Sequence, residues 1–511
     1  MSESRSPRPP ASVARGLARL VGRAHVSEAG VDRVAYSRDL WPKGMIWAGQ
    51  GQGRVHPPDA VVWPGSTEEV SEVLRYAWRR KLPVVPFGAG SGVCGGGLPV
   101  GGGLVLDLKR LDGLHIDRRT FTVRAGAGCI GQHLEDALNR QDATLGHFPS
   151  SMYCSSVGGW VAARSAGQMS SKYGKIEDMV LGLEAVLADG RVVQIDGAAK
   201  GPGWLQLLVG NEGTLAVITE ATLRIHPEPR RRIFRGFRFR GVGPGTDAIR
   251  RIFRSGLAPA AVRLYDEFDS LIARSYKDDD DGGGSSWLLP GPLKALMPEL
   301  TRRTVKTVLG RPLVLNRAID LLPADCLLIV GCEGEPFVAE AEMQAVLAVC
   351  RAAGGEDLGA GPGEHWYRHR YSVSYKQSKI FDAGAFVDTM EVATTWSNLM
   401  NMYQAVKKAV APHAFIMAHF SHAYREGCSI YFSFASTAER GQTLEERYDR
   451  TWRAALGAVA DSGATISHHH GVGYSKAGFM ERELGGGLAA YQALKRALDP
   501  RGVLNPGKMG L

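Results

Sequence analysis

Three consecutive histidines near the C-terminus, His468, His469 and His470, are the clearest set of side chains able to transfer protons. A neutral imidazole, with a pKa of about 6.5, can act as a general base and a hydrogen-bond donor near neutral pH. Adjacent residues of an extended chain point to opposite faces, so at most His468 and His470 could share a metal ion. No acid or cysteine spacing nearby completes a zinc site, and the same objection applies to His419 and His422. We interpret the run as acid–base groups; a buried structural cluster or a tag-like surface run is the alternative.

A glycine-rich stretch, Pro86–Gly97, offers a second kind of chemistry, the binding of an anion by main-chain groups. It contains six glycines and overlaps an apolar run at 82–87 that predicts a short strand. Without Cβ atoms the backbone can touch a ligand, and successive N–H groups can converge on one phosphate. A flexible turn is the alternative interpretation.

Other glycine-rich stretches are less specific. Residues 154–168 and 210–214 combine glycines with hydroxyl residues, which suits either a segment lying along a flat ligand or close helix packing. Gly126–Gly131 spells GxGxxG between an expected strand and an expected helix, as in a dinucleotide-binding fingerprint. The confirming acid about 20 residues on is absent, since 144–149 reads Thr-Leu-Gly-His-Phe-Pro. A tight turn is therefore favoured over a Rossmann site.

Composition excludes several classes of protein. The chain has 511 residues, 44% apolar, with a formal net charge of +9, and no basic stripe interleaved with aromatics suggests nucleic acid. Its seven cysteines form no CxxC, which indicates a reducing compartment, and we expect a cytoplasmic protein. No apolar run approaches the roughly 18 residues of a membrane span. The first 24 residues hold five arginines and one acid, so a transit peptide, a basic tail and peripheral membrane contact are alternatives there.

The elements that must position these residues fall into two groups. Up to residue 227, short strands and crossing helices predict an α+β domain rather than long βαβ repeats. Beyond residue 228 the pattern changes, and we expect a second domain with a charged, glycine-rich loop at 277–286 whose composition predicts disorder. We expect helices at 11–21, 69–80, 132–141, 293–310, 338–353 and 396–410, and strands at 60–63, 82–87, 104–108, 121–124, 184–187, 192–195, 215–225, 233–240, 326–330 and 429–435.

Four segments together resemble the FAD-binding vanillyl-alcohol oxidase and p-cresol methylhydroxylase superfamily, over nearly the whole chain. They are the glycine loop at 86–92, Ser155–Val161, Tyr173–Asp178 and Glu212–Ile218. The resemblance implies an α+β fold, with a two-part FAD-binding domain of the PCMH type and a substrate (cap) domain whose antiparallel sheet is flanked by helices. It implies an N-terminal segment at 1–58, the FAD-binding domain at 59–228, the cap domain at 229–465 and a C-terminal segment at 466–511 that completes the active site.

The resemblance also implies FAD held without a covalent bond, because the glycine loop contains no histidine. The residues that it places at FAD are Pro86, Phe87, Gly88, Ala89, Gly90, Ser91, Gly92, Pro149, Ser150, Ser151, Ser155, Ser156, Gly158, Gly159, Ala163, Arg164, Ser165, Ala166, Glu212, Gly213, Thr214, Val217 and Ile218.

Within the superfamily, the sequence is most similar to the alkyldihydroxyacetonephosphate synthase family. Val262–Leu264 resembles the family's segment that carries an active-site arginine, which places that role on Arg263. Gly427–Phe432 resembles the strand that carries its catalytic tyrosine, which places that role on Tyr431. Ser467–Gly473 resembles the catalytic histidine run, in which we choose His469 as proton acceptor, with His468 or His470 tuning it. The resemblance implies substrate contacts from Arg263, Gln377 and Tyr424.

Two features depart from the synthase pattern. A second expected arginine is replaced by Gln377, and an amide cannot replace a bidentate cation, so the substrate could differ. Asn505–Lys508 reads Asn-Pro-Gly-Lys, which looks more like the D-lactate and glycolate dehydrogenase branch.

The implied reaction exchanges the acyl chain of acyl-dihydroxyacetone phosphate for a fatty alcohol, with no net redox change, in ether-lipid synthesis. The alternatives are an FAD-dependent oxidase or dehydrogenase of a 2-hydroxy acid or related alcohol, a non-catalytic flavin or ligand module, and a zinc hydrolase. We expect a homodimer that acts on a small-molecule or lipid substrate and holds no catalytic metal.

Overall fold

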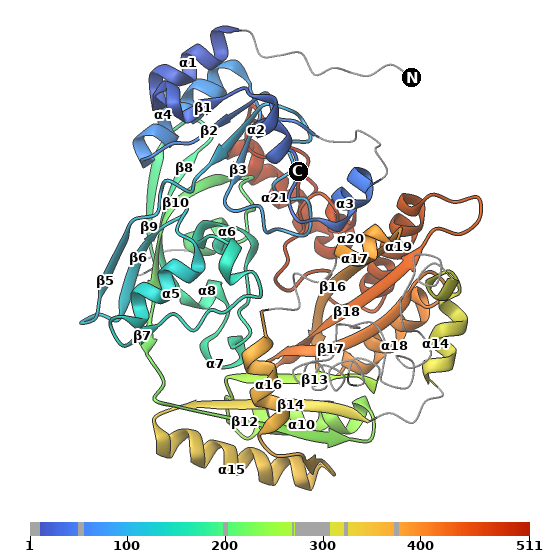
Figure 1. The fold of residues 1–511 in the computed structure, drawn as a ribbon. Helices are drawn as coiled ribbons and strands as arrows, with labels where there is room; N and C mark the ends of the chain where they lie inside the picture. Colours follow the sequence, from blue (N-terminus) through green and yellow to red (C-terminus); the bar gives the residue numbers. More distant parts are fainter. Residues whose placement is uncertain are drawn as a thin grey trace. The chain divides into compact units, whose positions relative to one another are not determined.

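The computed structural model describes residues 11–49, 56–197, 203–267, 270, 307–320, 325–371 and 378–511. The chain divides into two compact units (Figure 1). Unit 1 comprises Met1–Gly167, Gly174–Glu228 and His469–Leu511, and unit 2 comprises Gln168–Tyr173 and Pro229–His468. The expected loop at 277–286, most of the expected helix at 293–310, and Gln377 lie outside the described residues.

Unit 1 contains a four-stranded sheet in the order β1-β2-β4-β3, in which β2, β4 and β3 are parallel. These three strands are short runs of apolar residues that are almost fully buried, as parallel strands covered on both faces usually are. The strands are β1 (Val26–Ser27), β2 (Ala60–Val62), β3 (Val84–Phe87) and β4 (Leu104–Asp107).

Helix α4 (Thr67–Arg80) connects β2 to β3 and begins two residues before the helix expected at 69–80. The Ser66 hydroxyl accepts the backbone N–H of Glu69 at 3.2 Å, which is a standard N-terminal cap. Helix α1 (Ala11–Val21) packs closely on α4, because a Cβ on Gly16 would lie 2.3 Å from the Tyr76 hydroxyl. Val13, Leu17 and Val21 are buried, so the apolar side of α1 is used inside unit 1.

A second sheet of unit 1 is antiparallel and has five strands in the order β5-β6-β10-β8-β9. A hairpin joins β8 to β9, with Gly190 in the left-handed region at its turn. The strands are β5 (Leu114–Asp117), β6 (Thr122–Gly126), β8 (Val180–Leu187), β9 (Val192–Asp196) and β10 (Ala216–Arg224), with β7 (Ala143–Thr144) and β11 (His226–Pro227) forming a separate pair. The helices of unit 1 beyond those above include α2 (Gly30–Ala35), α3 (Pro42–Gly49), α5 (Gly131–Asn139), α6 (Val157–Ala163), α8 (Ile176–Met179), α9 (Trp204–Leu208), α20 (Met480–Leu484) and α21 (Gly486–Leu498).

Unit 2 is built on a seven-stranded antiparallel sheet in the order β15-β12-β14-β13-β17-β18-β16 (Figure 1). The strands are β12 (Arg231–Phe239), β13 (Ala261–Tyr265), β14 (Cys326–Gly334), β15 (Glu356–Asp357), β16 (Ala385–Thr395), β17 (Phe415–Ala423) and β18 (Gly427–Thr437). The helices are α7 (Ser170–Tyr173), α10 (Val242–Arg254), α14 (Pro312–Asp320), α15 (Pro336–Ala352), α16 (Gly361–His369), α17 (Ser378–Asp382), α18 (Leu399–Val410) and α19 (Leu444–Asp461).

The two faces of this sheet differ near its centre. On one face Phe420 and Phe432 pack against Tyr403 of α18, and Leu264 lies against Gly245 of α10. Burial alternates along β13, where every second residue from Arg263 is only partly buried. The opposite face therefore presents partly accessible side chains, and these include the predicted polar residues.

Several elements were not expected from the sequence. Helices α2 and α3 lie in the N-terminal segment at 1–58, in which only the helix at 11–21 was predicted, and α19, α21, β16 and β17 were not predicted at all. Helix α19 carries a recognisable signal, a capping box in which Thr443 and Glu446 satisfy each other's backbone N–H groups.

Candidate functional site

A row of four side chains crosses the sheet of unit 2, and we call it the polar row. Tyr265 pairs with His419, His419 with Tyr431, and Tyr431 with Glu391, on the adjacent strands β13, β17, β18 and β16. Directly opposite residues of antiparallel strands share a face, so these side chains lie on one face of the sheet. Arg263 precedes Tyr265 by two residues on β13 and therefore shares that face.

Two neighbours, His419 and Thr389, hold the side chain of Tyr431 in place. Its ring stacks on His419 with centroids 4.8 Å apart and an interplanar angle of 16°. The Thr389 hydroxyl donates to the Tyr431 hydroxyl at 3.2 Å. Burial raises the pKa of Tyr431 to about 12, and the charge of Glu391 adds to this while Arg263 opposes it. The phenol is therefore protonated at neutral pH and can donate a hydrogen bond.

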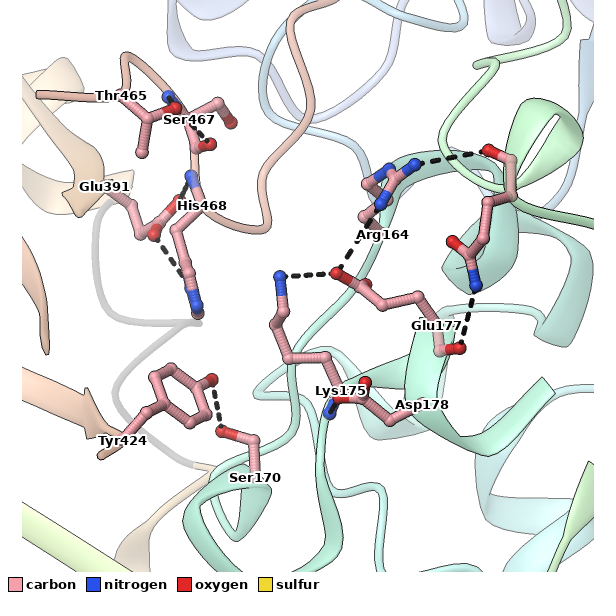
Figure 2. A network of polar contacts seen from close by, with 11 residues as sticks. Arg164, Ser170, Lys175, Glu177, Asp178, Glu391, Tyr424, Thr465, Ser467 and His468 are labelled. Carbon is pink, nitrogen blue, oxygen red and sulfur yellow. Dashed lines mark hydrogen bonds and ion pairs between the residues drawn. The ribbon is translucent and has the colours of Figure 1, made fainter. Parts of the chain in front are cut away.

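Glu391 and His468 form a close pair (Figure 2). Glu391 Oε1 lies 3.3 Å from His468 Nδ1, and Glu391 Oε2 accepts the backbone N–H of His468 at 3.1 Å. The carboxylate is completely buried and the imidazole almost so. A carboxylate at Nδ1 fixes the ring orientation and directs proton transfer to Nε2. Glu391 was missed from the sequence, where it stands between the apolar residues Met390 and Val392 of β16.

Ser170 joins two further rings in unit 2. Its hydroxyl lies 2.8 Å from His422 Nδ1. The same hydroxyl lies 3.0 Å from the Tyr424 hydroxyl (Figure 2). The rings of His422 and Tyr424 each have their centroid 5.5 Å from that of His468. The predicted substrate residue Tyr424 thus lies beside the first histidine of the run, and Ser170 is an additional member that the sequence did not indicate.

The remaining predicted residues of this group are separated by the division into units. Arg263 lies in unit 2, with its guanidinium 5.6 Å from the centroid of the Trp366 ring. His468 is the last residue of unit 2, whereas His469 and His470 belong to unit 1, where their rings meet edge to face at 4.7 Å.

The glycine loop of unit 1 lies against the start of α6 without room for side chains. A Cβ on Gly88 would lie 2.2 Å from Ser156 Oγ, and one on Gly158 would lie 2.6 Å from the Ala127 Cβ. Gly90 has a φ of +71°, which favours glycine, and a Cβ there would lie 2.7 Å from the Phe87 ring. Two sequence-distant segments predicted to contact FAD, 86–92 and 155–159, are thus brought together, with a glycine, Gly88, at their closest approach.

Two buried polar atoms near these segments have no hydrogen-bond partner among the described residues, His147 Nδ1 and Asn211 Oδ1. The His147 ring packs on Trp160 at 4.7 Å, and its Nε2 lies 3.2 Å from Ser165 Oγ. Burial lowers the pKa of His147 to about 3, so the ring is neutral. An unsatisfied buried polar atom costs about 1–3 kcal/mol, so both positions suit a polar ligand. FAD, which has donors and acceptors along its length, fits these two polar atoms, of which the Asn211 oxygen is an acceptor.

Arg164 and Glu212 use their charged groups within unit 1. Arg164 Nη1 lies 3.7 Å from Glu177 Oε1, which Lys175 also contacts at 2.5 Å (Figure 2). The Glu212 carboxylate accepts two backbone N–H groups of the C-terminal segment. Of the other residues predicted to contact FAD, Thr214 donates its hydroxyl to the Asn211 carbonyl at 2.7 Å, and Val217 and Ile218 are buried in β10.

Comparison with known proteins places the chain in a family. Residues 58–196 match the FAD binding domain, and residues 228–509 match the C-terminal domain of FAD linked oxidases. The chain belongs to the FAD-linked oxidase family. It is an FAD-dependent enzyme, as the sequence predicted.

Named relatives agree with this assignment. The chain is 31% identical over 466 residues to alkyldihydroxyacetonephosphate synthase of Dictyostelium discoideum, covering 88% of this chain and 73% of the relative. It is 27% identical over 503 residues to the glycolate oxidase subunit GlcD of Bacillus subtilis, covering 96% of this chain and 95% of the relative. A solved structure of alkyldihydroxyacetonephosphate synthase matches 99% of this chain and 86% of its own length, with 25% identity and a TM-score of 0.76. The predicted α+β fold of this superfamily is confirmed.

Within the described part of the chain, no helix combines the length and the apolar character that a membrane crossing requires.

Proposed function

We propose that this FAD-linked enzyme exchanges the acyl chain of acyl-dihydroxyacetone phosphate for a fatty alcohol. The observation that carries the proposal is the placement of Tyr431, Glu391 and Arg263 on one face of one sheet, with Glu391 bound to His468. This set offers a proton acceptor, a proton donor and a fixed cation for an anionic substrate group. The 31% identity to a synthase over most of both chains supports the same reaction.

In the proposed reaction the substrate loses a proton from the carbon next to its ketone, and a residue of the histidine run accepts it. His469 remains our prediction for this role, and the Glu391 carboxylate makes His468 the second candidate. Tyr431, protonated at neutral pH, donates a hydrogen bond to an oxygen on which charge develops. Arg263 holds the phosphate or a carboxylate.

The bond changes balance without net oxidation. The bond between the substrate carbon and the acyl oxygen breaks, and a fatty carboxylate leaves. The alcohol oxygen then bonds to the same carbon, the histidine run returns the abstracted proton to that carbon, and the alcohol's proton is released to water. When bound by the glycine loop and the segments around Ser156 and His147, FAD would supply an electron-accepting ring system. Formation of the ether from both substrates under anaerobic conditions is the direct test.

A 2-hydroxy-acid oxidoreductase is the second candidate. The similarity to a glycolate oxidase subunit extends over 96% of the chain, and Arg263 could bind the substrate carboxylate as well as a phosphate. In that reaction a 2-hydroxy acid loses two electrons and two protons, and the flavin is reduced. Lasting bleaching by glycolate or D-lactate without oxygen would favour it over the synthase reaction.

We further propose, on the resemblance alone, that the enzyme is a cytoplasmic homodimer that contacts a membrane peripherally and serves ether-lipid synthesis. Sedimentation velocity and co-flotation with phospholipid vesicles test the dimer and the membrane contact.

A further inference from the structure

The carboxylate of Glu212 binds the main chain that follows the histidine run. Glu212 Oε1 accepts the N–H of Val472 at 2.6 Å, and Oε2 accepts the N–H of Gly473 at 2.7 Å. Both oxygens are therefore occupied by consecutive backbone donors, and hydrogen bonds to an ionised carboxylate are stronger than neutral ones. Glu212 has a φ of +47°, an uncommon conformation for a side-chain-bearing residue.

The segment bound by Glu212 has no room for side chains at its two glycines. A Cβ on Gly471, whose φ is +77°, would lie 2.9 Å from Glu212 Oε1. A Cβ on Gly473 would lie 2.2 Å from the Cys94 carbonyl oxygen. That carbonyl accepts the N–H groups of Tyr474 and Ser475 at 2.9 and 3.0 Å. The chain that begins at His469 is therefore tied to unit 1 immediately after the last histidine.

Glu212 is in turn held by the C-terminal Asn-Pro-Gly-Lys sequence. Asn505 Nδ2 donates to the Glu212 carbonyl at 2.7 Å and to the Gly96 carbonyl at 3.0 Å. The ammonium of Lys508 is buried and donates to the Leu98 carbonyl at 2.8 Å. Burial raises the pKa of Glu212, whereas the two amide donors and the charges of Lys476 and Lys508 oppose that rise.

We propose that Glu212 is a positioning residue, which fixes His469 and His470 through residues 472 and 473, rather than a ligand of FAD. The proposal rests on the proposed function only for its activity assay. Misplacing a reacting group by about 1 Å can lower the rate about 10²-fold. Because the Glu212 hydrogen bonds lie so close to the histidines, their loss should slow catalysis. The sequence resemblance assigned Glu212 to FAD, and the two interpretations predict different outcomes.

The test compares Glu212→Gln with Glu220→Gln. The amide introduced at position 212 has a single acceptor oxygen, and its NH₂ group would face a backbone N–H. For Glu212→Gln we expect full FAD occupancy, measured by flavin absorbance. Its kcat should be about 10–100-fold lower than that of the wild type, and its KM should stay within about 3-fold. Hydrogen exchange should be faster than in the wild type in a peptide spanning 469–476. Glu220 lies on β10 of the same unit and is partly exposed, with its carboxylate 3.4 Å from Arg124, so its variant should match the wild type.

A second variant approaches the same contact from the other side. Gly471→Ala places a methyl group against Glu212 Oε1, so it should also lower kcat, and the double variant should lose less than the product of the single losses. Loss of FAD from Glu212→Gln, or unchanged exchange at 469–476, would overturn the proposal. Exchange and FAD occupancy need no substrate, so they test it even if the wild type forms no ether.

Discussion

Glu391 contacts His468 twice, through the ring Nδ1 at 3.3 Å and through the backbone N–H at 3.1 Å. One carboxylate thereby fixes both the position and the rotation of the imidazole. Glu391 is fully buried and lies directly across from Tyr431 in the sheet, so the pair and the phenol are parts of one arrangement. Removing a charge from such a buried pair leaves its partner without compensation.

Glu391→Gln should lower kcat by about 10²-fold while FAD stays bound. The amide keeps the size of the side chain but cannot stabilise a positive charge on His468. Steady-state kinetics with flavin absorbance as the occupancy measure checks this. Glu426→Gln, at an exposed position of unit 2, is the control and should leave kcat unchanged. A kcat within about 3-fold of the wild type would show that Glu391 is not needed.

Tyr431→Phe should lower kcat by roughly 10–100-fold, because the donated hydrogen bond is lost. With a pKa of about 12, the phenol of Tyr431 stays protonated across the usual assay range. Ionisation of Tyr431 should therefore cause no loss of the wild-type rate at any pH under 10. Tyr403→Phe, on the opposite face of the sheet, should alter stability but not the pH profile of kcat. An alkaline decline near pH 8 that disappears in Tyr431→Phe would contradict this role.

Gly88→Ala should weaken FAD binding by at least 10-fold, because its methyl group would lie 2.2 Å from Ser156 Oγ. Gly88→Ala combined with Ser156→Gly removes that obstruction and should recover part of the affinity. Gly113→Ala has open space around it and serves as the control. Fluorescence titration of apoprotein with FAD measures all of these. Equal affinity for the Gly88 and Gly113 variants would refute the close contact.

His147 should make the protein sensitive to acid. Its pKa is about 3 in the folded state against 6.5 when unfolded, so the unfolded state binds more protons between these values. Stability is therefore fully present above pH 6.5 and falls as pH drops through that window, by about 2 kcal/mol at pH 5. Urea unfolding at pH 7 and pH 5 should show a smaller difference for His147→Gln than for the wild type. Identical differences would mean that His147 is not the titrating group.

The sequence predicted the cofactor, the fold class and most strands of unit 1, because glycine spacing and short apolar runs are local signals. Strands β16 and β17 were missed, although they carry Glu391 and His419. Polar residues such as Glu391 and His419 interrupt the apolar pattern of these strands, so neither strand reads as a continuous apolar run.

The partners of the predicted residues could not be predicted in the same way. Glu391 lies 77 residues from His468, and Ser170 lies 252 residues from His422, so only the register of the sheet and the course of the chain bring them together. Glu212 was recognised as part of a motif, but the carboxylate contacts with residues 472 and 473 depend on backbone conformation that a sequence does not display.

The central claim is tested most directly by mixing the purified FAD-loaded enzyme anaerobically with acyl-dihydroxyacetone phosphate and hexadecanol. Products are followed by mass spectrometry and the flavin by its absorbance. The synthase assignment predicts an alkyl ether and a free fatty acid in equal amounts, with the flavin oxidised at the end. Absence of ether, together with lasting flavin bleaching by glycolate or D-lactate, would contradict it.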